Sequence, residues 1–293
     1  GLAFVLGTVG GIIIIPAKNI LEEDLIDTSN IFIAYCPERV LPGKIMTELV
    51  DNPRVIGGIN KESSKVVANF YRTFVNGEIL ESLANTAEMC KLTENSFRDV
   101  NIAFANELSI LCDNNGVNVW ELIKLANHHP RVNILQPGTG VGGHCIAVDP
   151  WFIVSKDPTN AKIIRTAREV NNYKSFWCVE KIKNQKLQFE LKYGRKPAIA
   201  IMGLAFKPNI DDLRESPAKF IAQKVLQNSN NEEYFIVEPN ISEHTEFKLI
   251  DHKEAVEKAD IIAFLVAHKE FKNLQISKDK VVLDFCGILN NNN

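Results

Sequence analysis

A glycine-rich segment near the middle of the chain leads directly into a cysteine. It reads Gln136-Pro-Gly-Thr-Gly-Val-Gly-Gly-His-Cys145, with glycines at Gly138, Gly140, Gly142 and Gly143. Glycine tolerates positive φ and lets backbone N–H groups approach a ligand closely. A cysteine straight after such a loop is expected to be partly exposed among amide dipoles, which favour the nucleophilic thiolate. The other interpretation is a tight turn with a buried cysteine, which is the more common one for a glycine loop alone.

Two further pairs of residues have the spacing that one helical turn brings together. Asp149 follows Cys145 by four residues, so a helical turn would place its carboxylate near the sulfur. Lys91 and Asn95 are also four residues apart and would share one face of a helix. Charged neighbours surround this second pair at Glu88, Glu94 and Arg98. By spacing alone they indicate only a solvated helix face, which is the commoner case.

A third segment, residues 203–217, lies between an expected strand and an expected helix. It reads Gly-Leu-Ala-Phe-Lys-Pro-Asn-Ile-Asp-Asp-Leu-Arg-Glu-Ser-Pro. In open α/β sheets, ligands bind at the carboxyl ends of strands, near helix N-termini. Lys207 and Arg214 lie in this loop and could bind phosphate oxygens.

The apolar pattern predicts the elements that must position these residues. Short apolar runs predict strands at residues 31–35, 55–58, 79–83, 198–204, 234–237, 261–266 and 281–285. Helical spacing predicts helices at residues 61–75, 86–113, 119–127, 160–185 and 252–259, with a further start at Ser216-Pro217. One apolar stripe runs along the helix over 86–113: Leu92, Phe97, Val100, Phe104, Leu108 and Leu111. Strands that alternate with helices predict a parallel sheet of βαβ units, an α/β fold.

Composition excludes several classes of protein. The 293 residues carry 33 Lys+Arg against 36 Asp+Glu, a net charge of -3 without a basic stripe, which gives nucleic-acid binding no electrostatic support. The length favours two or three domains. Six scattered cysteines, none in a CxxC pair, fit a reducing compartment and predict no metal site. Residues 1–17 carry no charge, and glycines and a proline interrupt them, so residues 12–15 are expected to form a buried strand rather than part of a membrane span.

Taken together, the motifs resemble those of the UDP-glucose/GDP-mannose dehydrogenase family. The resemblance covers about residues 28–285, and its segments are 36–43, 55–58, 86–95, 129–152 and 203–218. Within the family, segment 129–152 is most similar to the branch that acts on UDP-N-acetylmannosamine or UDP-N-acetylglucosamine. The resemblance implies three parts: a remnant of a Rossmann-type NAD-binding domain at 1–84, a helical central and dimerisation domain at 85–190, and a Rossmann-like UDP-sugar-binding domain at 195–293.

The family's chemistry implies roles for five residues. Its enzymes oxidise the C6 alcohol of the sugar to a carboxylate with two NAD+ in succession. Cys145 would attack the intermediate aldehyde to give a thiohemiacetal, which is then oxidised to a thioester and hydrolysed. Lys91 and Asn95 would stabilise the oxyanion, Asp149 would position water or shuttle a proton, and Glu38 would assist hydrolysis as a base.

The resemblance also implies binding residues and partners. The glycine loop would wrap the sugar and diphosphate, while Phe206 and Lys207 hold the UDP part. Arg131 would be lent to the active site of a neighbouring subunit, and Arg214 would contact the NAD diphosphate. The helix over 160–185 would form a homodimer. The product, an aminouronic acid, would serve a surface polysaccharide, and the enzyme would be cytoplasmic, with neither a membrane nor a nucleic acid as partner.

The front of the chain departs from the family pattern. The expected GxGxxG fingerprint after a first strand is missing, and residues 7–11 have the wrong spacing for it. We therefore expect an N-terminally truncated NAD-binding domain. Val148 before Asp149, and the segment 284–287, differ from UDP-glucose members of the family. Oxidation of UDP-N-acetyl-D-mannosamine is the first hypothesis. Its alternatives are oxidation of UDP-N-acetylglucosamine and a non-catalytic fragment that binds a UDP-sugar.

Overall fold

The computed structural model describes residues 31–40, 44–227, 229 and 232–289, which divide into two compact units. The first holds the chain up to Phe97 together with residues 148–158, and the second holds residues 98–147 and 159–293. The strand expected at residues 12–15, and the front segment expected to be truncated, lie outside the described residues.

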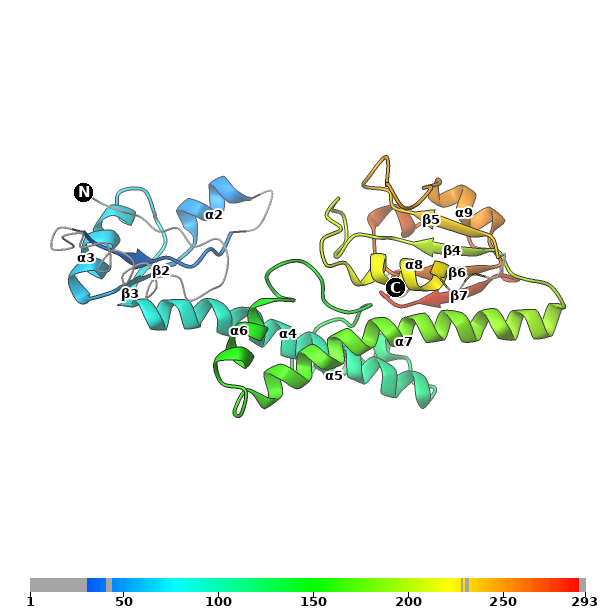
Figure 1. The fold of residues 1–293 in the computed structure, drawn as a ribbon, viewed down its shortest axis with the longest axis horizontal. Coiled ribbons are helices and arrows are strands. Elements are labelled where there is room, and N and C mark those ends of the chain that lie inside the picture. Colours follow the sequence, from blue (N-terminus) through cyan, green and yellow to red (C-terminus); the bar gives the residue numbers. More distant parts are fainter. Residues whose placement is uncertain (1–30, 41–43, 228, 230–231, 290–293) are drawn as a thin grey trace. The chain divides into compact units, whose positions relative to one another are not determined.

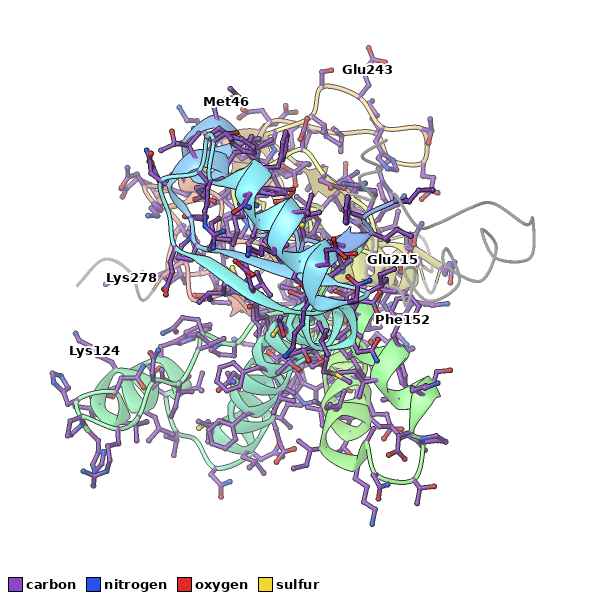
Figure 2. All side chains as sticks on the ribbon, turned by 90° about the vertical axis from the view of Figure 1, so that its left-hand side faces the viewer. Met46, Lys124, Phe152, Glu215, Glu243 and Lys278 are labelled. Carbon is purple, nitrogen blue, oxygen red and sulfur yellow. The ribbon has the colours of Figure 1, made fainter. Side chains whose placement is uncertain are left out.

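The first unit contains a small sheet with one helix packed on it (Figure 1). The strands are β1 (Ala34–Tyr35), β2 (Arg54–Gly58) and β3 (Ile79–Leu83), in the order β1-β2-β3. β1 pairs antiparallel with β2, and β2 pairs parallel with β3. Helix α3 (Lys61–Tyr71) begins at Asn60, whose side chain accepts a hydrogen bond from the Ser63 N–H and so caps the helix. The unit also holds two short helices, α2 (Ile45–Asp51) and α6 (Asp149–Lys156), and the part of the long helix from Ala84 to Phe97. Met46 on α2 is exposed, as Figure 2 shows.

The second unit contains a four-stranded parallel sheet, as the alternation of strands and helices predicted. Its order is β5-β4-β6-β7. The strands are β5 (Tyr234–Val237), β4 (Ile199–Met202), β6 (Ile261–Phe264) and β7 (Val281–Asp284). Residues of β4 alternate between two apolar clusters, one with the helices α7 (Lys162–Tyr193) and α8 (Pro217–Gln227), the other with α9 (His252–Lys258). Both faces of the sheet are therefore covered, which explains why the strands are continuous apolar runs.

Helix α4 (Ala84–Asn114) leaves half of its apolar stripe exposed. The helix forms as expected, but Phe97, Phe104 and Leu111 of the predicted stripe are 70%, 57% and 51% exposed. Apart from Leu92 of the stripe, the residues it buries are small or polar, among them Asp99 and Asn106 at 0% exposure. Toward α7, the helix packs instead through hydrogen-bonded polar side chains.

Two helices in the second unit can be compared with prediction at their ends: α5 agrees to within one residue, and α7 is longer than predicted. Helix α5 (Val119–Ala126) begins at Asn118, whose side chain accepts from the N–H groups of Trp120 and Glu121. Helix α7 continues eight residues beyond the predicted end and stops at Gly194, which has a φ of 66°. A left-handed residue ends a helix, and glycine adopts that conformation without steric cost. Within the described part of the chain, no helix is long and apolar enough to cross a membrane.

Candidate active site

In the first unit, the predicted helix face of Lys91 and Asn95 carries two hydrogen bonds. The Lys91 Nζ donates to the backbone oxygen of Glu38 at 2.7 Å. The Asn95 Nδ2 donates to the Asp149 Oδ2 at 2.5 Å. Both side chains are half-buried on α4, so the prediction that they share one helix face is confirmed. Four candidate residues from three chain segments thus meet in this unit.

Asp149 is buried at 2% exposure and is the first residue of α6. Pro150 follows it in the first turn, a position that proline favours. Residues 145–148 form a bend and a turn rather than a helix. The expected helical pairing of Cys145 with Asp149 was therefore wrong. Burial, together with the nearby carboxylates of Glu88 and Asp149, raises the pKa of Tyr35 to about 12.

In the second unit, the glycine loop is interlocked with the loop 204–216. The Gly143 N–H donates to the Arg214 carbonyl at 3.1 Å. A Cβ on Gly142 would lie 2.5 Å from the Glu215 carbonyl oxygen and 2.8 Å from the Phe206 Cβ. A Cβ on Gly143, at a φ of 78°, would lie 3.1 Å from the Phe206 ring. Glu215, labelled in Figure 2, itself has a φ of 48°. These contacts hold the two predicted ligand-binding segments against each other.

Polar groups of α4 and α7 hold the front of the same loop. The Gly138 N–H donates to the Asn106 Oδ1 at 2.8 Å, and the Ser175 Oγ donates to the Thr139 carbonyl at 2.8 Å. A Cβ on Gly140, at a φ of 139°, would lie 2.7 Å from the Ser175 Oγ. Three of the four glycines are thus required by contacts of the chain with itself. Gly138 has nothing within 4 Å of an added Cβ.

This difference between the glycines predicts unequal effects of alanine. We expect Gly142→Ala to lower the free energy of unfolding by about 1–3 kcal/mol, because its Cβ would overlap the backbone of the neighbouring loop. Gly138→Ala, the matched control in the same loop, is expected to stay within about 0.5 kcal/mol of the wild type. Urea unfolding followed by circular dichroism measures both variants. Equal losses would contradict the assigned interlock.

The buried polar face of α4 forms a hydrogen-bonded network with α7. The Arg168 Nη1 lies 2.7 Å from the Asp99 Oδ1, and the two side chains are 3% and 0% exposed. The Asn171 Nδ2 also donates to the Asp99 Oδ1, at 2.8 Å. The Asn106 Nδ2 donates to the Asn171 Oδ1 at 2.9 Å, which connects the network to the glycine loop. Burial raises the pKa of Asp99, although Arg168 opposes the shift.

Lys174 is a second buried cation on α7, at 2% exposure. Its Nζ donates to the Ser109 Oγ at 2.7 Å and lies 3.8 Å from the centroid of the Trp177 ring. Burial lowers the pKa of Lys174 to about 8. The lysine lines a cavity of about 350 Å³, which also contacts Pro137 before the glycine loop.

Four of the other cysteines have a thiol whose pKa is raised by burial. Burial raises the pKa of Cys36 to about 11 and that of Cys178 to about 12, and it also raises the pKa of Cys112 and Cys286. A buried thiol of high pKa is a poor nucleophile. Cys145 is half-buried, as expected for a residue directly after the glycine loop.

An exposed ion pair lies near Cys145. The Arg214 Nε is 3.0 Å from both carboxylate oxygens of Asp212, and its Nη2 is 2.6 Å from the Oδ2. Asp212 raises the pKa of Arg214, and the Cys145 side chain contributes in the same direction. The arginine side chain is 63% exposed, so its remaining donors face solvent. Lys207 is also exposed, with its Nζ 5.8 Å from the centroid of the Phe206 ring.

Comparison with known proteins matches the chain to three sequence models of one family. The NAD binding domain of the UDP-glucose/GDP-mannose dehydrogenase family matches residues 6–75, the central domain 85–173 and the UDP binding domain 200–291. A solved structure of UDP-D-ManNAc dehydrogenase from Pyrococcus horikoshii aligns with a TM-score of 0.87 at 36% identity, covering 99% of this chain and 69% of that one. The chain belongs to the UDP-glucose/GDP-mannose dehydrogenase family.

Among the curated members of this family, two relatives cover most of the chain. The UDP-N-acetyl-D-mannosamine dehydrogenase of Campylobacter jejuni is 56% identical over 267 residues, which are 89% of this chain and 63% of that protein. The NDP-N-acetyl-D-galactosaminuronic acid dehydrogenase of Ralstonia nicotianae is 51% identical over 268 residues, 89% of this chain and 62% of that protein. The chain thus spans about three fifths of the length of these relatives. The predicted family and fold class are confirmed.

The candidate residues fall into two groups of this family fold. The first unit holds Glu38, Lys91, Asn95 and Asp149. The second holds Cys145, the glycine loop, Phe206, Lys207 and Arg214. Arg131 also belongs to the second unit but lies on an exposed stretch after α5, where its N–H donates to the His129 Nδ1. In the described part of the chain, no group of three His, Cys, Asp or Glu side chains could hold a metal ion.

Sequence reasoning missed two buried residues behind the loop 204–209: Glu238, which directly follows β5, and His268, which follows β6. The signal was a polar residue after a buried strand, at the edge where ligands bind in α/β sheets.

Proposed function

We propose that this chain takes part in the NAD-dependent oxidation of the C6 alcohol of UDP-N-acetyl-D-mannosamine to the carboxylate. Relatives named UDP-N-acetyl-D-mannosamine dehydrogenase, 51–56% identical to the chain, support this substrate. The observation that carries the proposal is the interlock between the glycine loop and Phe206. It fixes Cys145, two residues after Gly143, beside the loop that carries Lys207 and Arg214.

Cys145 supplies the covalent chemistry in this proposal. Its thiolate attacks C6 of the intermediate aldehyde, forming a carbon–sulfur bond and an oxyanion. Loss of a hydride from C6 converts this adduct to a thioester, and water then cleaves the carbon–sulfur bond to release the carboxylic acid and the thiol. When bound, NAD+ accepts one hydride in each of the two oxidation steps. Arg214 fits a cofactor diphosphate, because Asp212 fixes its guanidinium while most of the group stays exposed.

Lys91 and Asn95 have the donors that an oxyanion requires. We assign them to stabilise the tetrahedral adduct, since an ammonium and an amide N–H lower the energy of developing negative charge. Asp149 accepts from Asn95 and so orients its amide. Asp149 is four residues from Cys145, a chain span of at most about 14 Å. Glu38, whose carboxylate accepts from the Val40 N–H at 2.7 Å, is assigned to assist hydrolysis as a base.

The binding roles of the remaining residues follow the same reading. The glycine loop, Phe206 and Lys207 hold the UDP-sugar, with the exposed Lys207 ammonium next to the ring of Phe206.

We further propose a homodimer to which Arg131 contributes from the neighbouring subunit. The exposed apolar residues Phe104 on α4 and Ile163 on α7, at 57% and 72%, support an interface on these helices. Sedimentation as a monomer at micromolar concentration would rule the dimer out. A cytoplasmic enzyme of surface polysaccharide synthesis is the setting that we propose.

Calorimetry separates this function from its alternatives. UDP-N-acetylmannosamine, UDP-N-acetylglucosamine and NAD+ are titrated separately into the purified chain. We expect the mannosamine nucleotide to bind more tightly than its C2 epimer, and NAD+ to bind as well. The reverse order of the sugars would favour a UDP-N-acetylglucosamine dehydrogenase. Heat from a sugar nucleotide without heat from NAD+ would favour a non-catalytic UDP-sugar-binding fragment, and no heat from any ligand would refute all three functions.

A further inference from the structure

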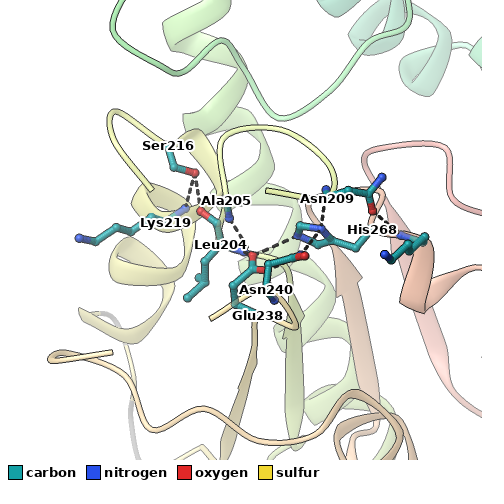
Figure 3. Close-up of polar contacts among 9 residues, drawn as sticks. Leu204, Ala205, Asn209, Ser216, Lys219, Glu238, Asn240 and His268 are labelled. Carbon is teal, nitrogen blue, oxygen red and sulfur yellow. Dashed lines mark hydrogen bonds and ion pairs between the residues drawn. The ribbon is translucent and has the colours of Figure 1, made fainter. Parts of the chain in front are cut away.

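A buried group of polar side chains lies behind the loop 204–209, and the proposed chemistry does not use it (Figure 3). Glu238 follows the carboxyl end of β5, and His268 lies beyond the end of β6. Both side chains are 0% exposed. Charged or polar groups withdrawn from water are costly unless they are fully hydrogen-bonded, so the partners of this pair show what it holds in place.

Glu238 holds the beginning of the loop. Its Oε2 accepts from the backbone N–H groups of Leu204 at 2.8 Å and Ala205 at 2.9 Å. Its Oε1 accepts from the backbone N–H of Asn240 at 3.0 Å. Burial favours the neutral acid, but the hydrogen bonds from His268 and from the backbone outweigh it and lower the pKa of Glu238 to about 2. The carboxylate is therefore a fixed acceptor for the first two residues of the loop.

His268 holds the end of the loop. Its Nδ1 lies 3.0 Å from the backbone nitrogen of Asn209, which can only donate. The Nδ1 must therefore be the acceptor, so the proton of the neutral ring is on the Nε2, which lies 3.0 Å from the Glu238 Oε2 and donates to it. Asn209 has a φ of 61°, and its Oδ1 accepts from the Lys269 N–H at 2.9 Å. Both ends of the loop are thus tied to one buried pair.

The residues between these two anchors are the ones assigned to the nucleotide. Phe206 and Lys207 lie between Ala205 and Asn209, and Lys207 is exposed. A loop that is ordered before binding loses less conformational entropy when the ligand arrives. We propose that Glu238 and His268 are positioning residues for a nucleoside diphosphate: they hold the loop 204–209 in the conformation that presents Phe206 and Lys207 to UDP. This inference rests on the proposed function.

A matched pair of glutamates tests the inference. Glu232 and Glu238 flank β5, and their side chains are 1% and 0% exposed, but Glu232 pairs with Lys186 at the opposite end of the strand. UDP is titrated calorimetrically into the wild type, Glu238→Gln and Glu232→Gln. We expect Glu238→Gln to weaken UDP binding about tenfold or more. The glutamine amide has one N–H₂ group in place of a carboxylate oxygen, and this donor cannot accept hydrogen bonds from the backbone N–H groups. Glu232→Gln is expected to bind within about twofold of the wild type at a similar loss of thermal stability.

Each result of this titration has one meaning. Equal weakening by the two variants would overturn the positioning role, because it would reduce the effect to general loss of stability. A wild type that does not bind UDP would refute the proposed function, and the positioning role for UDP with it. Hydrogen exchange measured by mass spectrometry then reports on the loop alone. Faster exchange of residues 204–209 in Glu238→Gln, with β4 still protected, would show that the pair holds the loop.

Two substitutions of His268 give a second and milder test. Asparagine places an amide oxygen near the position of Nδ1 and can still accept from the Asn209 N–H. Glutamine reaches the position of Nε2 and keeps only the contact with Glu238. We expect His268→Asn to retain more UDP affinity than His268→Gln, because it keeps the anchor at the end of the loop. The opposite order would overturn the role assigned to His268.

Discussion

Replacing Cys145 with serine is expected to reduce turnover of UDP-N-acetylmannosamine by more than about 10³-fold, because the covalent step loses its nucleophile. The serine hydroxyl keeps the size and position of the thiol but is a far weaker nucleophile at neutral pH. The affinity for the sugar nucleotide should stay within a few fold of the wild type, because the glycine loop keeps its contacts with Phe206 and Ser175. Steady-state rates and calorimetry on the same preparation measure both quantities.

Cys90 supplies the control for this experiment. Like Cys145, Cys90 is half-buried, and it lies on α4 next to Lys91. The third half-buried cysteine, Cys286, is less suitable because burial raises its pKa. Cys90→Ser is expected to keep the rate of the wild type within a few fold. Equal loss of rate and of sugar-nucleotide affinity in Cys145→Ser would instead make Cys145 a structural residue of the loop.

Replacing Arg168 with methionine is expected to lower the free energy of unfolding by about 3–5 kcal/mol, because the buried Asp99 carboxyl loses its cation and hydrogen-bond donor. Asp99 is 0% exposed, so water cannot replace the lost partner. The same network reaches the glycine loop through Asn171 and Asn106, so the loop should also exchange its amide hydrogens faster. Urea unfolding and hydrogen exchange measure the two effects.

Two further variants separate the buried pair from ion pairs in general. Arg72→Met removes an ion pair with Glu81 whose side chains are 46% and 36% exposed, and should cost less than about 1 kcal/mol. The double variant Asp99→Leu with Arg168→Met should recover much of the loss, since it removes both charges. If Arg168→Met were as mild as Arg72→Met, the network would not be what joins α4 to α7.

The strands of the sheet in the second unit were predictable from the sequence because both faces of the sheet are buried. Such strands are continuous apolar runs, and the run at 234–237 matches β5 residue for residue. Which residues of α4 are buried was not predictable from the sequence. The surface that α4 buries includes Asp99, Asn106 and Ser109, which are hydrogen-bonded to partners about 65–70 residues away on α7. A prediction that relies on apolar stripes alone places such polar residues on the solvent-exposed face of the helix.

The candidate site was predictable to the extent that single segments define it. The pair Lys91 and Asn95 follows from helical spacing, and the half-exposed Cys145 follows from its glycine loop. The helical pairing of Cys145 with Asp149 failed because the helix begins only at Asp149. Glu238 and His268 each stand alone in sequence, and only the parallel order of β5, β4 and β6 brings them to the same loop.

The number of hydrides removed from each sugar tests the central proposal most directly. The chain is incubated with excess NAD+ and a limiting, weighed amount of UDP-N-acetylmannosamine until the NADH absorbance is constant. We predict two NADH for each sugar nucleotide, with a carboxylate at C6 in the product, because Cys145 carries the aldehyde through the second oxidation. One NADH with an aldehyde product, or none at all, would contradict the proposed function.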